Sequence, residues 1–208
     1  GADVVLTTSQ KAIGSVPGAG LMMLSQNAIE ILENRESTIP SYYLNLKKWK
    51  VHMDNPKTYV ATPAIQVMVA LKTALEMIME EGLEHLINRH TRVASALRAG
   101  ASAIGLDILA DPEYQLNPLT PIVVPIGIDE ASVRRQLLED YHIEVSGALG
   151  ELRGKIWRVG LMGESARETN VFAFLSALET ILSKEGYEVA FGASLAAAQK
   201  TLVDFANA

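Results

Sequence analysis

A lysine that follows a predicted strand is the residue of this sequence best placed to do chemistry. Lys11 lies in the segment Thr8-Ser9-Gln10-Lys11-Ala12, after the apolar β-formers of Val4–Thr8 and before the Pro/Gly-rich turn Ser15–Gly20. In an α/β sheet, a lysine at the carboxyl end of a strand points into the crevice where ligands bind. Removal from water lowers the proton affinity of such an amine, which can then form a Schiff base. Position alone favours the simpler alternative, a solvated lysine in a loop.

Other catalytic signatures are absent from the sequence. It contains no G-x-x-x-x-G-K-[ST] phosphate loop, no G-x-G-x-x-G, no H-E-x-x-H and no G-x-S-x-G elbow. His85 and His90 are five residues apart, off the i, i+4 spacing that would direct two imidazoles at one metal ion. We therefore expect no metal site.

The elements that position Lys11 must come from the first part of the chain. Ser15–Gly20 carries strong turn formers, Ser25 is a predicted N-cap, and Thr62-Pro63 predicts a helix start. The elements expected there are a buried strand over Val4–Thr8, a second strand over Leu21–Leu24, a helix over Asn27–Asn34, an irregular polar stretch over 35–58, and a largely buried helix over Ala64–Glu81.

After Gly82, a predicted helix break, the pattern of expected elements changes. A long amphipathic helix is predicted over Leu83–Ala103, followed by short elements that alternate as in α/β domains. The expected strands are Leu106–Ala110, Pro121–Ile126, Ile143–Ser146 and Lys155–Leu161, and the expected helices are Asp129–Tyr141, Ala166–Leu182 and Ser194–Ala206. This change predicts a domain boundary near 82–105.

Composition indicates a folded protein and excludes several functional classes. Of 208 residues, 49% are hydrophobic and 20% are charged, which suits a sizeable core and not a disordered chain. The 18 basic and 24 acidic side chains give a net charge of −6 without a dense basic cluster, so nucleic acid is not an expected partner. The apolar runs stop well short of the roughly 20 residues of a membrane span. We expect a cytoplasmic protein without membrane contact.

The first residues favour a fragment. The chain begins Gly1-Ala2-Asp3 without an initiator methionine, and by its fifth residue it already reads as a strand. A trimmed or processed chain would look the same. The chain also has no cysteine, which removes thiolate metal sites, iron–sulfur clusters and cysteine nucleophiles.

Three ordered motifs span nearly the whole chain. They are Asp3–Ala12 followed by Val16-Pro17-Gly18, the Tyr59-x-x-Thr62-Pro63 pattern within 55–63, and Gly150–Gly163 around Arg158. In this order they resemble the lysine segment, the Tyr-x-x-Thr-Pro segment and the arginine strand of the class V pyridoxal-phosphate-dependent aminotransferases. The likeness is closest to the alanine–glyoxylate and serine–pyruvate (serine–glyoxylate) branch.

The resemblance implies an α/β, fold-type I transferase, of which this chain is the C-terminal portion. Residues 1–82 would be the C-terminal part of the large, cofactor-binding domain. Residues 83–104 would form a connector helix, and residues 105–208 a small α/β domain. The family also implies a homodimer whose active site is shared between the subunits.

The resemblance assigns roles to five residues. Lys11 would hold pyridoxal 5′-phosphate as a Schiff base, and Gln10 would lie beside the cofactor phosphate. Tyr59 and Thr62 would reach the phosphate of the neighbouring subunit's cofactor. Arg158 would bind the substrate carboxylate, for which a guanidinium fork is suited because it donates two parallel hydrogen bonds. Taken singly, Tyr59 could be a packing aromatic, Thr62 a helix cap and Arg158 a surface residue.

The implied reaction is transamination between a small amino acid, alanine or serine, and a 2-oxo acid such as glyoxylate or pyruvate. The family places the acidic partner of the pyridine nitrogen before the lysine segment, so the 208 residues alone are expected to be inactive or nearly so. Two alternatives stay open. One is a non-catalytic truncated or degenerate interaction module, and the other is a further class V enzyme, such as a lyase or a phosphonate or ureidoglycine transaminase. The lack of cysteine argues against a cysteine desulfurase.

Overall fold

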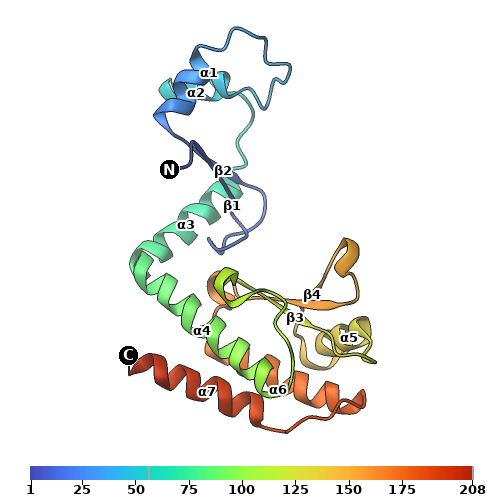
Figure 1. Ribbon diagram of the computed structural model, residues 1–208. Coiled ribbons are helices and arrows are strands. Elements are labelled where there is room, and N and C mark those ends of the chain that lie inside the picture. The colour runs from blue at the N-terminus through green and yellow to red at the C-terminus, as the bar shows by residue number, and fades with distance from the viewer. Residues whose placement is uncertain (56, 208) are drawn as a thin grey trace. The chain divides into compact units, whose positions relative to one another are not determined.

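The computed structural model describes residues 1–55 and 57–207, so Pro56 of the Tyr59 motif lies outside the described residues. Contacts divide the chain into two compact units, residues 1–77 and residues 78–208. The first unit is drawn in blue to cyan in Figure 1, and the second runs from green to red. The three-part division at 82 and 104 stays a prediction.

The first unit begins with the predicted strand pair. β1 (Val4–Thr8) and β2 (Gly20–Leu24) form an antiparallel hairpin in which Val4 lies opposite Leu24 and Thr8 opposite Gly20. The predicted cap at Ser25 is confirmed, because its Oγ accepts a 3.1 Å hydrogen bond from the backbone N–H of Ala28 at the start of α1 (Gln26–Glu33). Turn residues and a capping serine therefore fix the local structure around the Lys11 segment.

The expectation of an irregular stretch over 35–58 is wrong in part, since it contains α2 (Leu46–Asp54). The N-cap is Asn45, whose side chain accepts a 3.1 Å hydrogen bond from Lys47 N. Hydrogen bonds to residues outside the helix also stabilise α2. The Trp49 indole donates to Tyr43 O at 2.6 Å, and Lys47 Nζ donates to Glu33 O and Arg35 O at 3.1 and 2.9 Å. Capping and tertiary contacts thus outweigh a weak amphipathic pattern.

The expected burial of β1 and of the helix predicted over Ala64–Glu81 is also wrong. Val4, Val5 and Leu6 of β1 are 49%, 44% and 67% exposed. The helix α3 (Ile65–Glu81) forms as predicted, but Ala74 is its one buried residue. The physical reason is that a two-stranded sheet offers too little surface to cover an apolar strand or helix.

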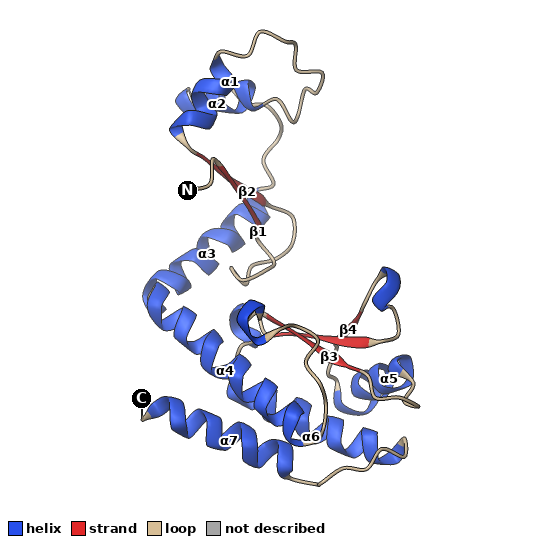
Figure 2. Cartoon of the chain, viewed as in Figure 1, coloured by secondary structure: helices blue, strands red, loops and turns tan. Residues whose placement is uncertain are grey.

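The second unit surrounds a three-stranded antiparallel sheet of order β3-β5-β4. Its helices cover the sheet and one another, as Figure 2 shows. The strands are β3 (Leu119–Val123), β4 (Ser146–Gly147) and β5 (Ile156–Gly160), and the helices are α4 (Leu83–Ala103), α5 (Glu130–Tyr141), α6 (Glu168–Lys184) and α7 (Ala193–Ala206), with short 3₁₀ helices at Pro112–Tyr114, Gly150–Leu152 and Gly163–Ser165.

Two of the four strands expected in this part of the chain are not formed as predicted. Leu106–Ala110 makes one bridge, Ile108 to Ile122, before the chain enters the 3₁₀ helix capped by Asp111. Ile143–Ser146 reduces to β4, because His142 ends α5 in the left-handed conformation (φ 56°) and pairing begins at Ser146. The predicted strands are therefore too long where a helix cap lies directly before or after them.

The core of the second unit lies between α4, α6, α7 and the sheet. The long helix predicted over Leu83–Ala103 has these bounds, and its inner face carries Val93, Ala94 and Leu97, each at most 1% exposed. Trp157 on β5 is fully buried and donates from its indole nitrogen to Glu130 O at 3.2 Å. This packed core is the scaffold that carries Arg158.

Candidate active site

Lys11 lies in a hydrogen-bonded turn that leaves β1. Its backbone N–H donates to Thr8 O at 3.4 Å, and its carbonyl accepts from Gly14 N at 2.9 Å. Gly14 has φ 74°, a conformation that favours glycine. The side chains of Lys11 and Gln10 are both exposed. The structure therefore presents the lysine amine and the neighbouring amide outward from a fixed backbone.

Ser9 closes this turn, a role that the sequence analysis does not predict. It is fully buried. Its backbone N–H donates to Ala19 O at 3.0 Å, and its carbonyl accepts from Ser15 N at 2.9 Å. Its hydroxyl donates to Val16 O at 2.6 Å and accepts from Ala19 N at 3.2 Å. The one signal in the sequence is a serine two residues before the lysine, which does not indicate the groups that the serine bonds.

The turn also packs against α3. Gly18 has φ 132°, and a Cβ at this position would lie 3.1 Å from Val67 Cγ2. A larger residue would therefore be strained both by its backbone and by this close approach. Thr62 is exposed just before α3. Contact of the turn with α3 links the Lys11 segment to the helix that follows Thr62.

Tyr59 lines an open pocket of about 300 Å³ in the first unit. Its ring is 69% exposed. Lys48 also borders the pocket, with Nζ 3.5 Å from the centre of the Tyr42 ring. A phenol hydroxyl and a held ammonium group are suited to an anionic ligand. The other lining residues are Lys47, Val51, Thr58 and Val60.

Arg158 lies on β5 of the second unit, opposite Ser146 on β4 and Pro121 on β3. It is half-buried, and its Nε donates to Gly147 O at 2.8 Å. Among the described residues, this is the only hydrogen bond of its side chain. The bond orients the guanidinium and leaves both terminal nitrogens available to a carboxylate.

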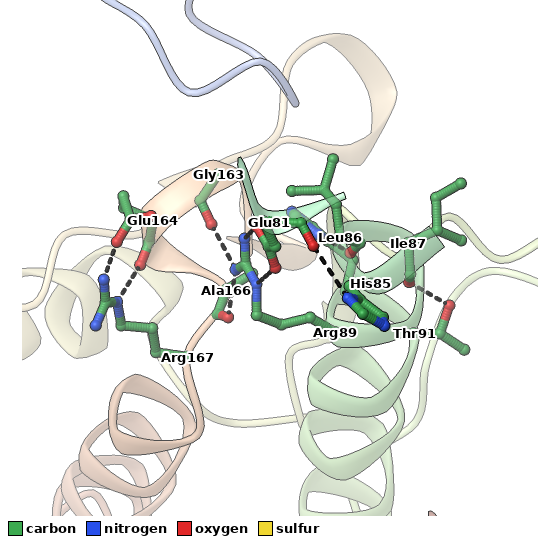
Figure 3. Close-up of polar contacts among 11 residues, drawn as sticks. Glu81, His85, Leu86, Ile87, Arg89, Thr91, Gly163, Glu164, Ala166 and Arg167 are labelled. Carbon is green, nitrogen blue, oxygen red and sulfur yellow. Dashed lines mark hydrogen bonds and ion pairs between the residues drawn. The ribbon is translucent and has the colours of Figure 1, made fainter. Parts of the chain in front are cut away.

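The segment that follows β5 is held by Arg89, as Figure 3 shows. Its guanidinium donates to both carboxylate oxygens of Glu81, at 2.5 and 2.8 Å, and to the carbonyls of Gly163 and Ala166, at 3.0 and 2.9 Å. The hydrogen bond from Arg89 lowers the pKa of Glu81, and Glu81 in turn raises the pKa of Arg89. The role of Arg89 could not be predicted from the sequence, because the two carbonyls are 74 and 77 residues away along the chain.

Residues 1–55 and 57–207 hold no cluster of three or more His, Cys, Asp or Glu side chains arranged to bind a metal ion. No helix in the same ranges is long and apolar enough to cross a membrane.

Solved structures define the class of fold. A ureidoglycine–glyoxylate aminotransferase from Bacillus subtilis matches 96% of this chain and 51% of its own, with a TM-score of 0.91 at 31% identity. A pyridoxamine–pyruvate aminotransferase from Mesorhizobium loti matches 100% and 53%, with a TM-score of 0.92 at 29% identity. The chain has the α/β fold of the C-terminal portion of fold-type I, pyridoxal-phosphate-dependent aminotransferases.

Relatives with similar sequences include named aminotransferases. A serine–glyoxylate aminotransferase from Arabidopsis thaliana is 34% identical over 205 residues, 97% of this chain and 50% of the relative. An uncharacterized aminotransferase of Methanocaldococcus jannaschii is 34% identical over 187 residues, which are 90% of this chain and 48% of the relative. A protein named soluble hydrogenase, small subunit, from a Synechococcus species is 35% identical over 204 residues, 97% and 52%.

The chain thus spans about half the length of the curated relatives it matches. No family model matches it. Its homologues are alanine– and serine–glyoxylate and related class V aminotransferases, and this chain corresponds to their C-terminal portion. The resemblance of the chain to these aminotransferases is confirmed, while the roles of Lys11, Gln10, Tyr59, Thr62 and Arg158 stay predictions.

Proposed function

We propose that this chain is the C-terminal portion of a transaminase that moves an amino group from alanine or serine to glyoxylate or pyruvate. The observation that carries the proposal is the placement of Lys11. Its amine is exposed on a turn that Ser9 locks at the end of β1. Relatives that share 30% or more identity over most of the chain are named glyoxylate aminotransferases.

The residues fit pyridoxal phosphate as a cofactor. The ligand offers an aldehyde and a phosphate, which require an amine and a set of hydrogen-bond donors. Lys11 supplies an exposed amine, and the exposed Gln10 amide and Tyr59 hydroxyl supply donors. When bound, the pyridine ring withdraws electron density from the substrate Cα.

Each residue then has a defined task. Lys11 would hold the cofactor covalently through its amine and would carry the substrate α-proton as a general base. Gln10, Tyr59 and Thr62 would bind the cofactor phosphate and so orient the ring. Arg158 binds the substrate carboxylate through its two terminal nitrogens, which its bond to Gly147 leaves available. We expect ping-pong kinetics, because the amino donor and the 2-oxo acid would react with the protein in turn.

The active protein in this proposal is a homodimer, with Tyr59 and Thr62 serving the neighbouring subunit's cofactor. The support is the apolar surface of the first unit. On α3, Ile65, Met68 and Val69 are 56%, 54% and 60% exposed. Apolar surface of this extent in one element is typical of a face that another chain or segment covers. We place the protein in the cytoplasm.

Substitution of Lys11 by alanine in the complete protein tests the proposal. We expect turnover of alanine and serine with glyoxylate to be lost, together with the borohydride-stable adduct between the protein and pyridoxal phosphate. Lys200→Ala, at an exposed lysine on α7, is the matched control and should keep both. Retained turnover in Lys11→Ala would exclude the assignment.

The same assay separates the remaining candidates. The structural neighbour from Bacillus subtilis is named for ureidoglycine and glyoxylate, so ureidoglycine belongs in the panel of amino donors. Turnover with ureidoglycine alone would favour that activity. An unchanged complete protein that neither binds pyridoxal phosphate nor turns over any donor would favour the non-catalytic interaction module.

A further inference from the structure

Ser9 is unusual among the described residues of the first unit. Three of them are buried, namely Ser9, Val60 and Ala74, and Ser9 is the only polar one. Its exposed fraction is 0%, against 9% for each of the other two. A buried hydroxyl costs free energy unless it is hydrogen-bonded. Burial of a serine in an otherwise open unit therefore calls for a specific reason.

The reason lies in its four hydrogen bonds. The N–H, the carbonyl and both roles of the hydroxyl of Ser9 are used, and their partners lie at Ser15, Val16 and Ala19. These partners sit on the returning arm of the same turn. Ser9 thus joins the start of the turn to its end, with residues 10–14 enclosed between the bonded groups.

Lys11 lies inside the segment that Ser9 closes. Its own backbone is bonded on both sides, to Thr8 O and from Gly14 N, so that its Cα has little freedom. Its side chain is exposed. The arrangement fixes the origin of the lysine side chain without restricting its amine. A covalent reaction gains rate when the reacting group is held in this way.

We propose that Ser9 is a positioning residue for Lys11, which acts through the backbone of the turn and not by contact with the cofactor. This inference rests on the proposed function. It adds to that function a residue, two positions before the lysine, whose hydroxyl sets how readily the lysine amine reaches the pyridoxal phosphate aldehyde.

The test compares two serines of one turn. Ser9→Ala removes a hydroxyl with two hydrogen bonds, whereas Ser15→Ala removes a buried hydroxyl that has no partner among the described residues. Both variants are made in the complete protein. The readouts are the rate of formation and the pH dependence of the borohydride-stable adduct at Lys11, and hydrogen exchange of the Ala19 amide without cofactor.

We expect Ser9→Ala to slow adduct formation by about tenfold and to speed exchange of the Ala19 amide, while Ser15→Ala stays within about twofold of the unchanged protein. Ser9→Thr keeps the hydroxyl and should restore most of the rate if the variant folds. Equal rates in Ser9→Ala and Ser15→Ala would overturn the inference and leave the proposed function intact. No adduct in the unchanged protein would overturn both.

Discussion

The two units of this chain follow the same local rules and reach opposite levels of burial. In residues 78–208, a packed core includes Leu97, Leu175 and Leu178, each fully buried. In residues 1–77, the apolar strand β1 and the first turns of α3 are largely exposed. Caps, turns and periodicity determine which elements form, but burial requires other elements to pack against them.

The difference bears on where chemistry is placed. The second unit holds Arg158 on a strand backed by a complete core, whereas the first holds Lys11 on a turn kept in shape by hydrogen bonds. Truncation of a buried apolar side chain in the second unit should therefore lower the stability of the chain through lost packing. Truncation of an exposed apolar side chain in the first unit should change the stability of the 208-residue chain little.

Leu178→Ala is expected to give the largest effect. The side chain is fully buried on α6, so its removal should lower the free energy of unfolding by about 2–5 kcal/mol. Leu6→Ala, at a residue 67% exposed on β1, is the matched control and should cost less than about 0.5 kcal/mol. Urea unfolding measures both, because each unit has one tryptophan, Trp49 or Trp157, as a fluorescent reporter. Equal losses would contradict the contrast between the units.

Glu179→Gln should have the next largest effect. The buried carboxylate accepts hydrogen bonds from Gly192 N, Ser194 N and Ser194 Oγ at 2.8, 3.0 and 2.5 Å, at the start of α7. Burial alone would raise the pKa of Glu179, but these bonds outweigh it and hold the pKa below its ordinary 4.5. Glutamine replaces one acceptor oxygen by a donor, which should cost about 1–3 kcal/mol at neutral pH.

The pH dependence of this loss has a defined sign. Because the folded pKa is lowered, the stabilisation is fully present above the unfolded pKa, near 4.5, and is lost as pH falls through the folded pKa. Unfolding midpoints of Glu179→Gln and the unchanged chain should therefore converge as the solution is acidified below pH 4.5. Glu76→Gln in the first unit, an exposed partner of Lys72, is the control and should change stability by less than about 0.5 kcal/mol. A loss that is independent of pH would show that Glu179 acts by packing alone.

Sequence reasoning succeeded where local signals decide the structure. Ser25, Gly82 and Asp129 mark helix starts that the structure contains, and α4 has the bounds predicted for it. It failed where the outcome depends on distant residues. α2 escaped detection because its supporting contacts, from Lys47 to Glu33 and Arg35, span 12 to 14 residues.

The candidate site shows the same limit. Lys11 followed from its place after a strand, and Arg158 from a family motif, so both could be named from the sequence. Ser9 and Arg89 could not, because their roles depend on backbone carbonyls and amides whose positions no residue type encodes. Residues that contact a ligand can often be recognised from their type, whereas residues that hold the backbone in place often cannot.

Arg89→Lys should give the smallest of the three effects and tests one such backbone contact. Lysine can keep a charge near Glu81 but cannot also donate to the carbonyls of Gly163 and Ala166, since a single ammonium lacks the spread of the guanidinium fork. We expect a loss of about 1 kcal/mol in the free energy of unfolding of the second unit, measured by Trp157 fluorescence. Arg167→Lys, whose partner Glu164 is 55% exposed, is the matched control and should be nearly neutral. Because the lowered pKa of Glu81 depends on Arg89, the loss should also shrink on acidification below the ordinary range of a glutamate. If both variants proved neutral, the turn after β5 would be held by the core alone, and the contrast between a packed second unit and a hydrogen-bonded first unit would become sharper.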